Sequence, residues 1–552
     1  MSTVRALLLI SGLLAMAFLD EPTSAPKPPS AGARDDASAQ ATPAKQDKPK
    51  ESTAKKHRGK FTISKETTYV TGPLDKDGYI DYAAALNERL SKGVTPENNA
   101  NVLIWKAIGP RPERREISSE FFRKLGMEAP PEKGEYYVDL FKYLKEQFQI
   151  ELGDEAWQID EQLQRAMERP WTAQDYPKVA SWLKSIERPL DLMVEASRRR
   201  HCFSPMVPGK TEKGSSGLLA VLVRAGLQQC RQMTGALAAR AMLRTGQEAL
   251  EDAWHDLLAC HRLARLLGSG PGIIDGLVGI AIDGVASRAD LALLNGSKPN
   301  ALQIQSWLRD LQKLPPMPAL ADKVDLGERF VFLDSLMAID REGMQYVKFL
   351  AIFKLDDPNP LAQAKLEGID WDFALRNGND WYDGMAAALR ENDRGIRSRK
   401  VGEIDAKADA DLKSLKLKLA TPKGQAEIIL SGKLVGDLLI GLVAPAVHKV
   451  QNAWDRVQQQ EDNVVVAFAL AWHQRDHGYY PKKLEELAPK YLKQIPGDVF
   501  SGKPLIYRPN EKGYLLYSVG YNGKDEDGRG REDEPPGDDL SVRMPLPELP
   551  KK

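Results

Sequence analysis

Apolar residues recur along most of the chain at the three- and four-residue spacings of amphipathic helices. Two such patterns lie between residues 218 and 267, and Thr245 and Gly246 separate them. This arrangement predicts a helical hairpin. Other helices are expected over residues 96–108, 119–125, 138–167, 173–199, 273–294, 300–314 and 320–353. Residues 61–430 are therefore predicted to form an irregular α-helical body of one or two domains.

Two segments depart from this helical pattern. Residues 60–69 alternate apolar and polar side chains, which predicts a short strand at the entry to the folded region. Residues 368–384 are rich in Trp, Asp and Asn and are expected to form a loop. The hairpin over residues 218–267 is similar to one tetratricopeptide-like repeat, but no second copy follows at the required period. An irregular helical domain is therefore expected instead of a solenoid.

A narrow apolar seam predicts one long amphipathic helix over residues 438–471. Its members are Leu439, Val443, Ala446, Val450, Ala453, Val457, Val464, Phe468 and Ala471. Glu461 interrupts the seam, and Pro445 is expected to kink the helix near its start. A core helix is the simpler interpretation of this seam, and a partner-binding surface is the alternative.

The N-terminal segment has the pattern of an export signal. Arg5 precedes an apolar run over residues 6–19, which is too short for a comfortable membrane span. Small residues allow cleavage after Ala17 or after Ala25, so the signal peptide is expected to be residues 1–17 or 1–25 and the protein to reach the periplasm or cell envelope. An uncleaved anchor is the alternative, and contact with a membrane is expected only in that case.

Residues 26–60 contain no apolar side chain larger than Ala or Pro, and they are predicted to be a disordered tether. The chain as a whole has 77 Lys and Arg against 77 Asp and Glu, which argues against a nucleic-acid-binding protein. With 42% hydrophobic residues, most of the chain can build ordinary cores. Three cysteines are too few for a disulfide scaffold or a four-thiolate zinc site.

Cysteine and histidine pairs offer weak signals of chemistry. Cys230 and Cys260 are equidistant from the hairpin turn, so a disulfide is one alternative, although buried thiols are the default. His473 and His477 have the spacing of a helical zinc pair, but the zincin pattern needs a Glu where Gln474 stands. A helix that ends at the glycine after His477 explains these residues better.

The C-terminal region resembles type IV pilins and, more closely, the major pseudopilin of type II secretion. The resemblance covers residues 433–544 and rests on the order LLIGLVAPAV, DHGYYP, LEEL, PGDVFSGKPLIYR and GYLLYSVGYNG. It implies a pilin-like C-terminal α+β module over residues 431–552, with one long helix and a short antiparallel sheet. Because Lys433 and Asp437 interrupt the apolar run and more than 400 residues precede it, polymerisation as a pilus subunit is not expected. The whole chain is also similar to large uncharacterised exported bacterial proteins.

The resemblance also implies a calcium ion in the loop after the second of these strands. The ligands carried over, together with two acidic residues of an insertion that lacks a clear counterpart, are Val519, Asn522, Lys524, Asp525, Asp527, Asp538 and Asp539. Val519 and Lys524 would contribute their carbonyl oxygens. Calcium prefers six to eight oxygen ligands, and eight carboxylates between residues 525 and 539 repel one another unless a cation or nearby basic residues compensate them. A solvated acidic loop is the alternative.

Three functions remain open on this basis. The favoured one is a noncatalytic extracytoplasmic interaction or scaffold protein, with envelope or secretion-related proteins as expected partners. A secreted hydrolase or metalloenzyme is the second, with a site near His201, His255, His261 or residues 381–383. A helical ligand-binding module without catalysis is the third. No catalytic residue is assigned, and calcium is the one expected cofactor.

Overall fold

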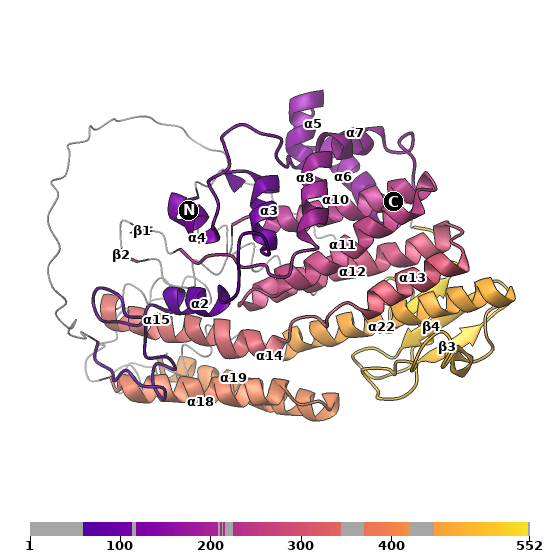
Figure 1. The fold of residues 1–552 in the computed structure, drawn as a ribbon. Helices are drawn as coiled ribbons and strands as arrows, with labels where there is room; N and C mark the ends of the chain where they lie inside the picture. The colour runs from indigo at the N-terminus through magenta and orange to yellow at the C-terminus, as the bar shows by residue number, and fades with distance from the viewer. Residues whose placement is uncertain are drawn as a thin grey trace.

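The computed structural model describes residues 59–112, 117–207, 210–211, 214–215, 225–343, 369–419 and 447–549. These residues are mainly helical and carry a small antiparallel sheet near the C-terminus (Figure 1), as expected for the mainly α class. The predicted signal peptide and nearly all of the tether lie outside the described residues. No helix among the described residues is long and apolar enough to cross a membrane.

The N-terminal third is built from short helices. They are α2 (Tyr82–Leu90), α3 (Ala100–Ile108), α4 (Ser119–Leu125), α5 (Leu140–Phe148), α6 (Asp154–Glu168), α7 (Pro177–Ser185) and α8 (Glu187–Ala196). Helix α4 has the predicted boundaries, because Ser118 caps its start and Gly126 ends it in a left-handed conformation. Helix α3 starts later than predicted, since Asn99 caps it. The long patterns over residues 138–167 and 173–199 are each split into two helices.

Most of the helices that follow are longer, and the four-residue α14 is the exception. These helices are α10 (Leu227–Gly246), α11 (Leu250–Gly268), α12 (Ile273–Gly296), α13 (Ala301–Gln312), α14 (Leu320–Lys323), α15 (Arg329–Glu342), α18 (Trp371–Leu389), α19 (Arg394–Leu419) and α22 (Val447–His477). A π-helical turn, η2 (Val324–Glu328), joins α14 to α15. Helices α10 and α11 form the predicted hairpin, and both pack on α12. Two short strands, β1 (Lys210–Thr211) and β2 (Gly214–Ser215), pair with each other and form a separate two-stranded sheet.

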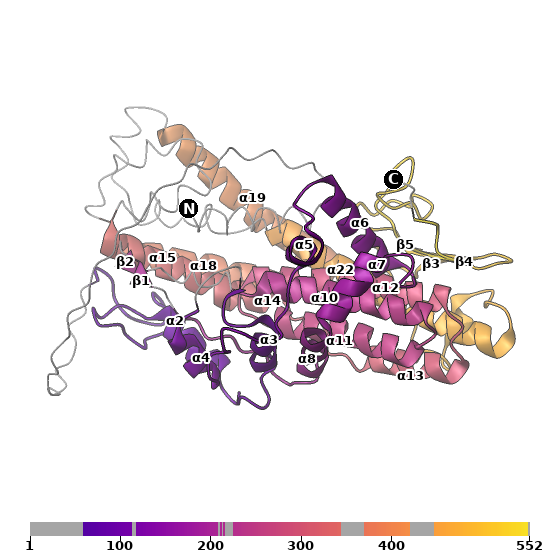
Figure 2. The same ribbon diagram turned by 90° about the horizontal axis from the view of Figure 1, so that it is seen from above.

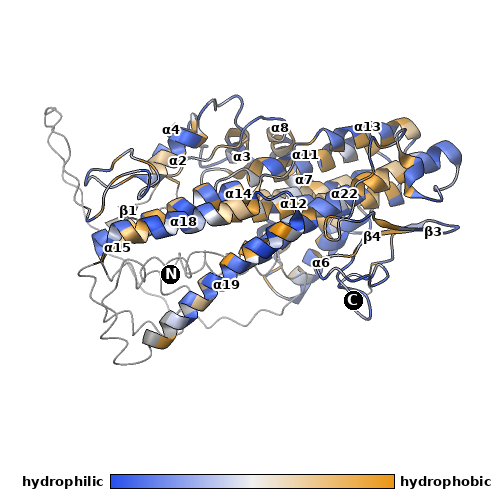
Figure 3. Ribbon diagram, turned by 90° about the horizontal axis from the view of Figure 1, so that it is seen from below, coloured by the Kyte–Doolittle hydropathy of each residue, from blue (hydrophilic) through white to orange (hydrophobic). Residues whose placement is uncertain are grey.

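The buried side chains form two hydrophobic cores. One core lies among α3 to α8, α10, α11, α13 and the C-terminal sheet, and the other lies among α2, α14, α15, α18 and α19. Helices α12 and α22 contribute to both: Ile273 and Val450 lie in the second core, whereas Leu293 and Phe468 lie in the first. Figure 3 shows both long helices running through the apolar middle of the molecule, while α19 diverges from α18. These two helices therefore connect the halves of the body.

The seam of α22 is a core surface, as the simpler interpretation expected. Val450, Val457, Val464 and Phe468 are buried, and α22 contacts α12 and α13. The predicted kink at Pro445 and the first three seam residues lie outside the described residues. The helix ends at His477, where the next residue, Gly478, has a φ of 82°.

The C-terminal sheet is antiparallel with the order β3 (Ile506–Pro509), β4 (Tyr514–Ser518) and β5 (Leu540–Met544), and a 3₁₀ turn, η3 (Leu484–Leu487), precedes it. Ile506 pairs with Tyr517, and Tyr514 pairs with Met544. The sheet rests on the second half of α22 (Figure 2), where Asn463 Nδ2 donates to the carbonyl of Leu540 at 2.9 Å. This docking fixes where the β4–β5 loop emerges.

Two sequence predictions were wrong. Residues 60–69 form turns instead of a strand, because the hydroxyls of Thr67 and Thr68 bond to nearby backbone carbonyls and compete with strand pairing. Residues 371–384 belong to helix α18 instead of a loop. Asp370 caps its start by accepting from Phe373 N at 2.9 Å, and the Trp and Tyr residues supply its buried face.

Candidate functional site

Three carboxylates converge in the loop between β4 and β5. Glu526, Asp538 and Asp539 each offer an oxygen atom, and these atoms lie within 4.8 Å of one another. Asp538 and Asp539 come directly before β5, and the loop folds back so that Glu526 reaches them. Among the described residues, this is the group of acidic, His or Cys side chains that has the spacing of a cation site.

Backbone amides orient the three carboxylates. Asp539 Oδ2 accepts from Glu526 N at 3.1 Å and from Gly528 N at 2.8 Å. Asp538 Oδ2 accepts from Asn522 N at 2.9 Å, and Glu526 Oε2 accepts from Asp538 N at 2.8 Å. The Oδ1 atoms of both aspartates are buried and have no hydrogen-bond donor in the described part of the chain. Two buried acceptors thus lack a donor, an arrangement that is costly unless a cation or a carboxyl proton satisfies them.

Burial, neighbouring charges and hydrogen bonds shift the pKa values of these three carboxyl groups. Burial raises the pKa of Asp539 to about 6, and the neighbouring charges of Glu526 and Asp525 raise it further against the hydrogen bonds it accepts. Burial also raises the pKa of Asp538. The hydrogen bond from the Asp538 backbone lowers the pKa of Glu526. A divalent cation would favour the charged form of all three groups.

The structure brings together only part of the predicted ligand set. Asp538 and Asp539 lie in the carboxylate group, and Asn522 supports it by donating to Glu526 through Nδ2 at 2.8 Å. Asp525 accepts from Tyr517 at 2.9 Å and Asp527 pairs with Arg508 at 3.0 Å, so each has a partner outside the group. Asp525 nevertheless lies close enough for its charge to raise the pKa of Asp539, and the role of Asp525 and Asp527 as ligands stays a prediction.

Val519 and Lys524 were predicted to bind through their carbonyl oxygens, and Glu526 was not predicted as a ligand. The amide of Val519 donates to Asp498 at 3.1 Å, and the amide of Lys524 donates to Asn522 at 2.6 Å. Both contacts involve the amides, and the role of the two carbonyls as ligands stays a prediction. Glu526 was missed because twelve residues separate it from Asp538, and no sequence spacing marks such a contact.

Asp498 anchors the base of this loop. Its carboxylate accepts from Ser518 Oγ at 2.7 Å and from the amides of Val519 and Phe500. Gln459 on α22 accepts from Val499 N at 2.7 Å, which ties the same segment to the long helix. The loop therefore starts from a rigid support of fully hydrogen-bonded buried groups.

A second polar cluster lies deep in the body, at His261 on α11. Its Nδ1 lies 2.7 Å from Asp283 Oδ1, and its Nε2 lies 2.9 Å from Asp290 Oδ2, both on α12. Arg265 pairs with Asp283 and, at 2.9 Å, with Glu461 on α22. His261 is 2% exposed, and both ring nitrogens are occupied. The ring has no accessible nitrogen for a substrate proton, so this cluster is structural.

The charges of the cluster balance one another. Burial opposes the charge of His261, but Asp283 and Asp290 outweigh burial and raise its pKa to about 10. Burial also opposes the charge of Asp283, but His261 and Arg265 outweigh it and hold its pKa below the usual range. Burial, together with Asp283, raises the pKa of Glu461, and burial raises that of Asp290 against His261. Asp283 is therefore the carboxylate that His261 and Arg265 together keep charged.

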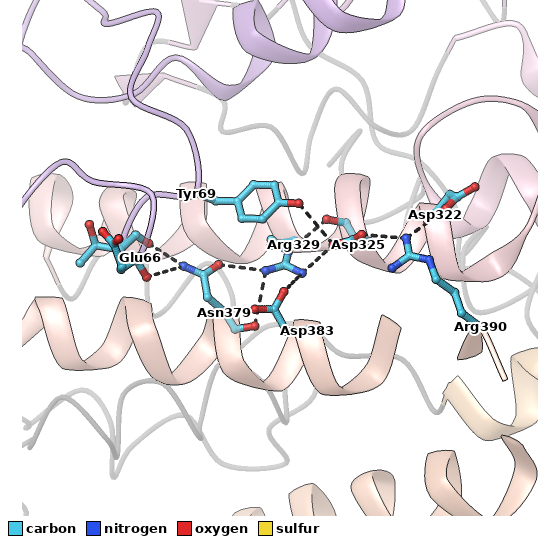
Figure 4. Close-up of polar contacts among 9 residues, drawn as sticks. Glu66, Tyr69, Asp322, Asp325, Arg329, Asn379, Asp383 and Arg390 are labelled. Atoms are coloured by element: carbon cyan, nitrogen blue, oxygen red, sulfur yellow. Dashed lines mark hydrogen bonds and ion pairs between the residues drawn. The ribbon is translucent and has the colours of Figure 1, made fainter. Parts of the chain in front are cut away.

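The segment of residues 381–383 also has a structural role. Asp383 accepts from Arg329 Nη2 at 2.7 Å, and Asp325 accepts from the same nitrogen at 2.6 Å. Figure 4 shows Arg329 between α18 and the N-terminal segment, with Asn379 donating to the carbonyls of Glu66 and Thr67. The Arg329 side chain is fully buried. This network holds residues 66–69 onto the second core.

The remaining candidates form no catalytic group with one another. His255 is exposed, and the backbone of His201 pairs with Asn98 and Ala100. Cys230 and Cys260 are both buried and not disulfide-bonded, so the default expectation is confirmed.

The helix-end interpretation of the two C-terminal histidines is supported by their contacts. His473 Nδ1 lies 3.1 Å from the carbonyl of Tyr479, and His477 Nε2 lies 3.1 Å from the hydroxyl of Tyr491. These contacts occupy a nitrogen of each ring at the end of α22.

The chain was compared with protein-family models, curated proteins and solved structures, and none of the three comparisons found a match.

Proposed function

We propose that this chain is a noncatalytic extracytoplasmic interaction or scaffold protein whose C-terminal head binds calcium. The observation that carries the calcium assignment is the pair of buried Oδ1 atoms of Asp538 and Asp539, which lack donors among the described residues. The scaffold assignment rests on the N-terminal sequence pattern of an export signal, on the polar composition of residues 26–60 and on the helical core through which α12 and α22 run. Envelope or secretion-related proteins are the proposed partners.

The dimensions of the acidic group suit calcium. Calcium–oxygen distances of about 2.3–2.6 Å place two ligand atoms on opposite sides of the ion up to about 5 Å apart. The oxygens of Glu526, Asp538 and Asp539 fall within 4.8 Å of one another. Three carboxylates supply part of a coordination shell, and water or loop carbonyls would supply the rest. Calcium would compensate their charge and hold the β4–β5 loop against β5.

Thermal unfolding of the full chain tests the calcium proposal. Millimolar calcium is expected to raise the melting temperature by several degrees, and excess EDTA should reverse the rise, because a ligand that binds only the folded state stabilises it. Asp539→Asn should abolish the response. Asp527→Asn is the matched control, since Asp527 pairs with Arg508 outside the group and asparagine tolerates its positive φ of 60°. An unchanged melting temperature at 10 mM calcium, or equal responses of both variants, would refute the proposal.

Export is tested separately. N-terminal sequencing of the protein from the periplasmic or extracellular fraction is expected to start at residue 18 or 26, after removal of the signal segment. A chain that stays in the cytoplasm with an intact first residue would contradict the proposed location and leave the calcium measurement unaffected.

A further inference from the structure

A cleft of about 810 Å³ lies in the helical body, away from the acidic loop. Its walls are the segment after α8, the second half of α11 and the segment after α13, and both α8 and α13 contact α11. Figure 2 shows the three helices side by side. The volume lies in the range of small-molecule sites.

Among the described residues, six cationic side chains line this cleft. They are Arg198, Arg199, Arg200, Arg262, Arg265 and Lys313. Asp310 is the one carboxylate among the described lining residues, and it accepts from Trp254 Nε1 at 3.2 Å. The imbalance is local, because the whole chain carries equal numbers of basic and acidic residues.

Two of the six cations already have carboxylate partners. Arg265 pairs with Asp283 and Glu461 in the buried cluster, and Arg199 pairs with Glu195 at 3.2 Å. The other four, Arg198, Arg200, Arg262 and Lys313, form no ion pair with a carboxylate of the described residues. The cleft therefore holds excess positive charge.

Arg198, Arg200 and Lys313 are exposed, whereas Arg262 is partly buried and holds its own charge at a cost. Burial lowers the pKa of its guanidinium, Asp310 opposes that effect, and the like charge of Arg198 lowers the pKa further. Partial charges at the ends of α8, α11 and α13 favour cations, but each end supplies only about half a negative charge. Together with Asp310 they offset about two and a half of the four unpaired positive charges.

We propose that this cleft binds a small molecule that carries two or more phosphate or carboxylate groups. Arg198, Arg200 and Arg262 hold the anionic groups, because a guanidinium presents parallel donors that match phosphate and carboxylate oxygens. The apolar side chains of Phe203 and Leu314 line the same cleft and contact the remainder of the ligand. The cleft then acts as a ligand site in the helical body, independent of the calcium-binding head.

Isothermal titration of the full chain with pyrophosphate and with citrate tests this proposal. The buffer is freed of metal with a chelating resin, since soluble chelators are polycarboxylates themselves, and its ionic strength is kept constant. Saturable binding of at least one probe is expected. Tighter binding of pyrophosphate identifies a phosphate ligand, and tighter binding of citrate identifies a carboxylate ligand.

Substitutions of the cleft arginines test whether the probes bind in the cleft. Arg262→Gln is expected to weaken the affinity about tenfold, and a second change, Arg198→Gln, by a similar factor, because a charge-assisted hydrogen bond of this kind is worth roughly one decade in the dissociation constant. Arg123→Gln is the matched control, because Arg123 is exposed on α4 outside the cleft. Absence of binding at millimolar concentrations of both probes, or equal affinities of the Arg262 and Arg123 variants, would overturn the proposal. Asp539→Asn should leave the affinity unchanged, which separates this result from the calcium measurement.

Discussion

Arg265 Nη2 donates to Glu461 Oε1 at 2.9 Å and so joins α11 to α22 across 196 positions of the chain. Glu461 is the charged residue that interrupts the apolar seam of α22. The interruption is explained by its partner, because a buried carboxylate is tolerated where a guanidinium compensates it. The contact places a C-terminal helix inside the same ionic cluster as the central hairpin.

We expect Arg265→Met to destabilise the folded chain by about 3–5 kcal/mol, because it leaves Asp283 and Glu461 buried without their guanidinium partner. Arg309→Met is the control, since Arg309 is exposed on α13 and should change the free energy of unfolding by less than ~0.5 kcal/mol. Both values come from chemical denaturation. A loss at position 265 as small as that at position 309 would contradict a compensated buried cluster.

The ionisation of His261 should make stability depend on pH. Its pKa is raised to about 10 in the folded chain, from about 6.5 when unfolded, by Asp283 and Asp290 against the effect of burial. The group therefore stabilises the fold fully below pH 6.5, and this contribution disappears as the pH rises through 10.

The stability difference between wild type and His261→Gln is accordingly expected to be largest near pH 6 and to shrink steadily up to pH 10. Denaturant titrations at intervals of one pH unit measure it. Arg265 and Glu461 face the same cluster, so the variant comparison is needed to isolate the histidine. A difference that does not vary with pH would show that the ring is neutral in the fold.

Stabilisation by calcium should also depend on pH. It should increase as the pH rises, whereas the stabilisation by His261 decreases. Burial raises the pKa of Asp539 to about 6, from about 3.9 in the unfolded chain, with Glu526 and Asp525 as neighbouring charges. Without calcium, the stabilisation from this protonated group is present below pH 3.9 and is lost as the pH rises through 6. Calcium needs the carboxylate, so the calcium-induced rise in melting temperature should be small at pH 5 and full by pH 7.5. An equal rise at both pH values would exclude Asp539 as a ligand.

Helices α15 and α18 approach each other closely at Gly378. A Cβ atom there would overlap the ring of Phe332, which is fully buried. Gly378→Ala is therefore expected to destabilise the chain by about 1–3 kcal/mol. Gly402→Ala on α19 has open space around its Cβ and should stabilise the helix by up to ~1 kcal/mol. Denaturation midpoints of the two variants that shift in the same direction would contradict this packing.

The sequence predicted the helical class and most of the helices because their apolar residues repeat at helical spacing. Gly126 and Gly478 end α4 and α22 as expected, since a left-handed residue at a helix end is a local requirement. Local sequence patterns gave a wrong secondary structure in two segments. Most polar residues of 368–384 lie on the outer face or at the cap of α18, and the buried Asn379 is satisfied by the carbonyls of residues 66 and 67. The hydroxyls of residues 60–69 bond within their own turn.

The candidate sites were decided by tertiary structure. Sequence placed Asp538 and Asp539 in an acidic loop, but only the fold brings Glu526 to them and turns Asp525 and Asp527 toward other partners. The cationic cleft is assembled from three segments that are widely separated along the chain, so no spacing in the sequence indicated it. Periodicity records which face of an element is buried. The identity of the partner that covers that face, or of the charge that approaches it, depends on long-range packing that periodicity does not encode.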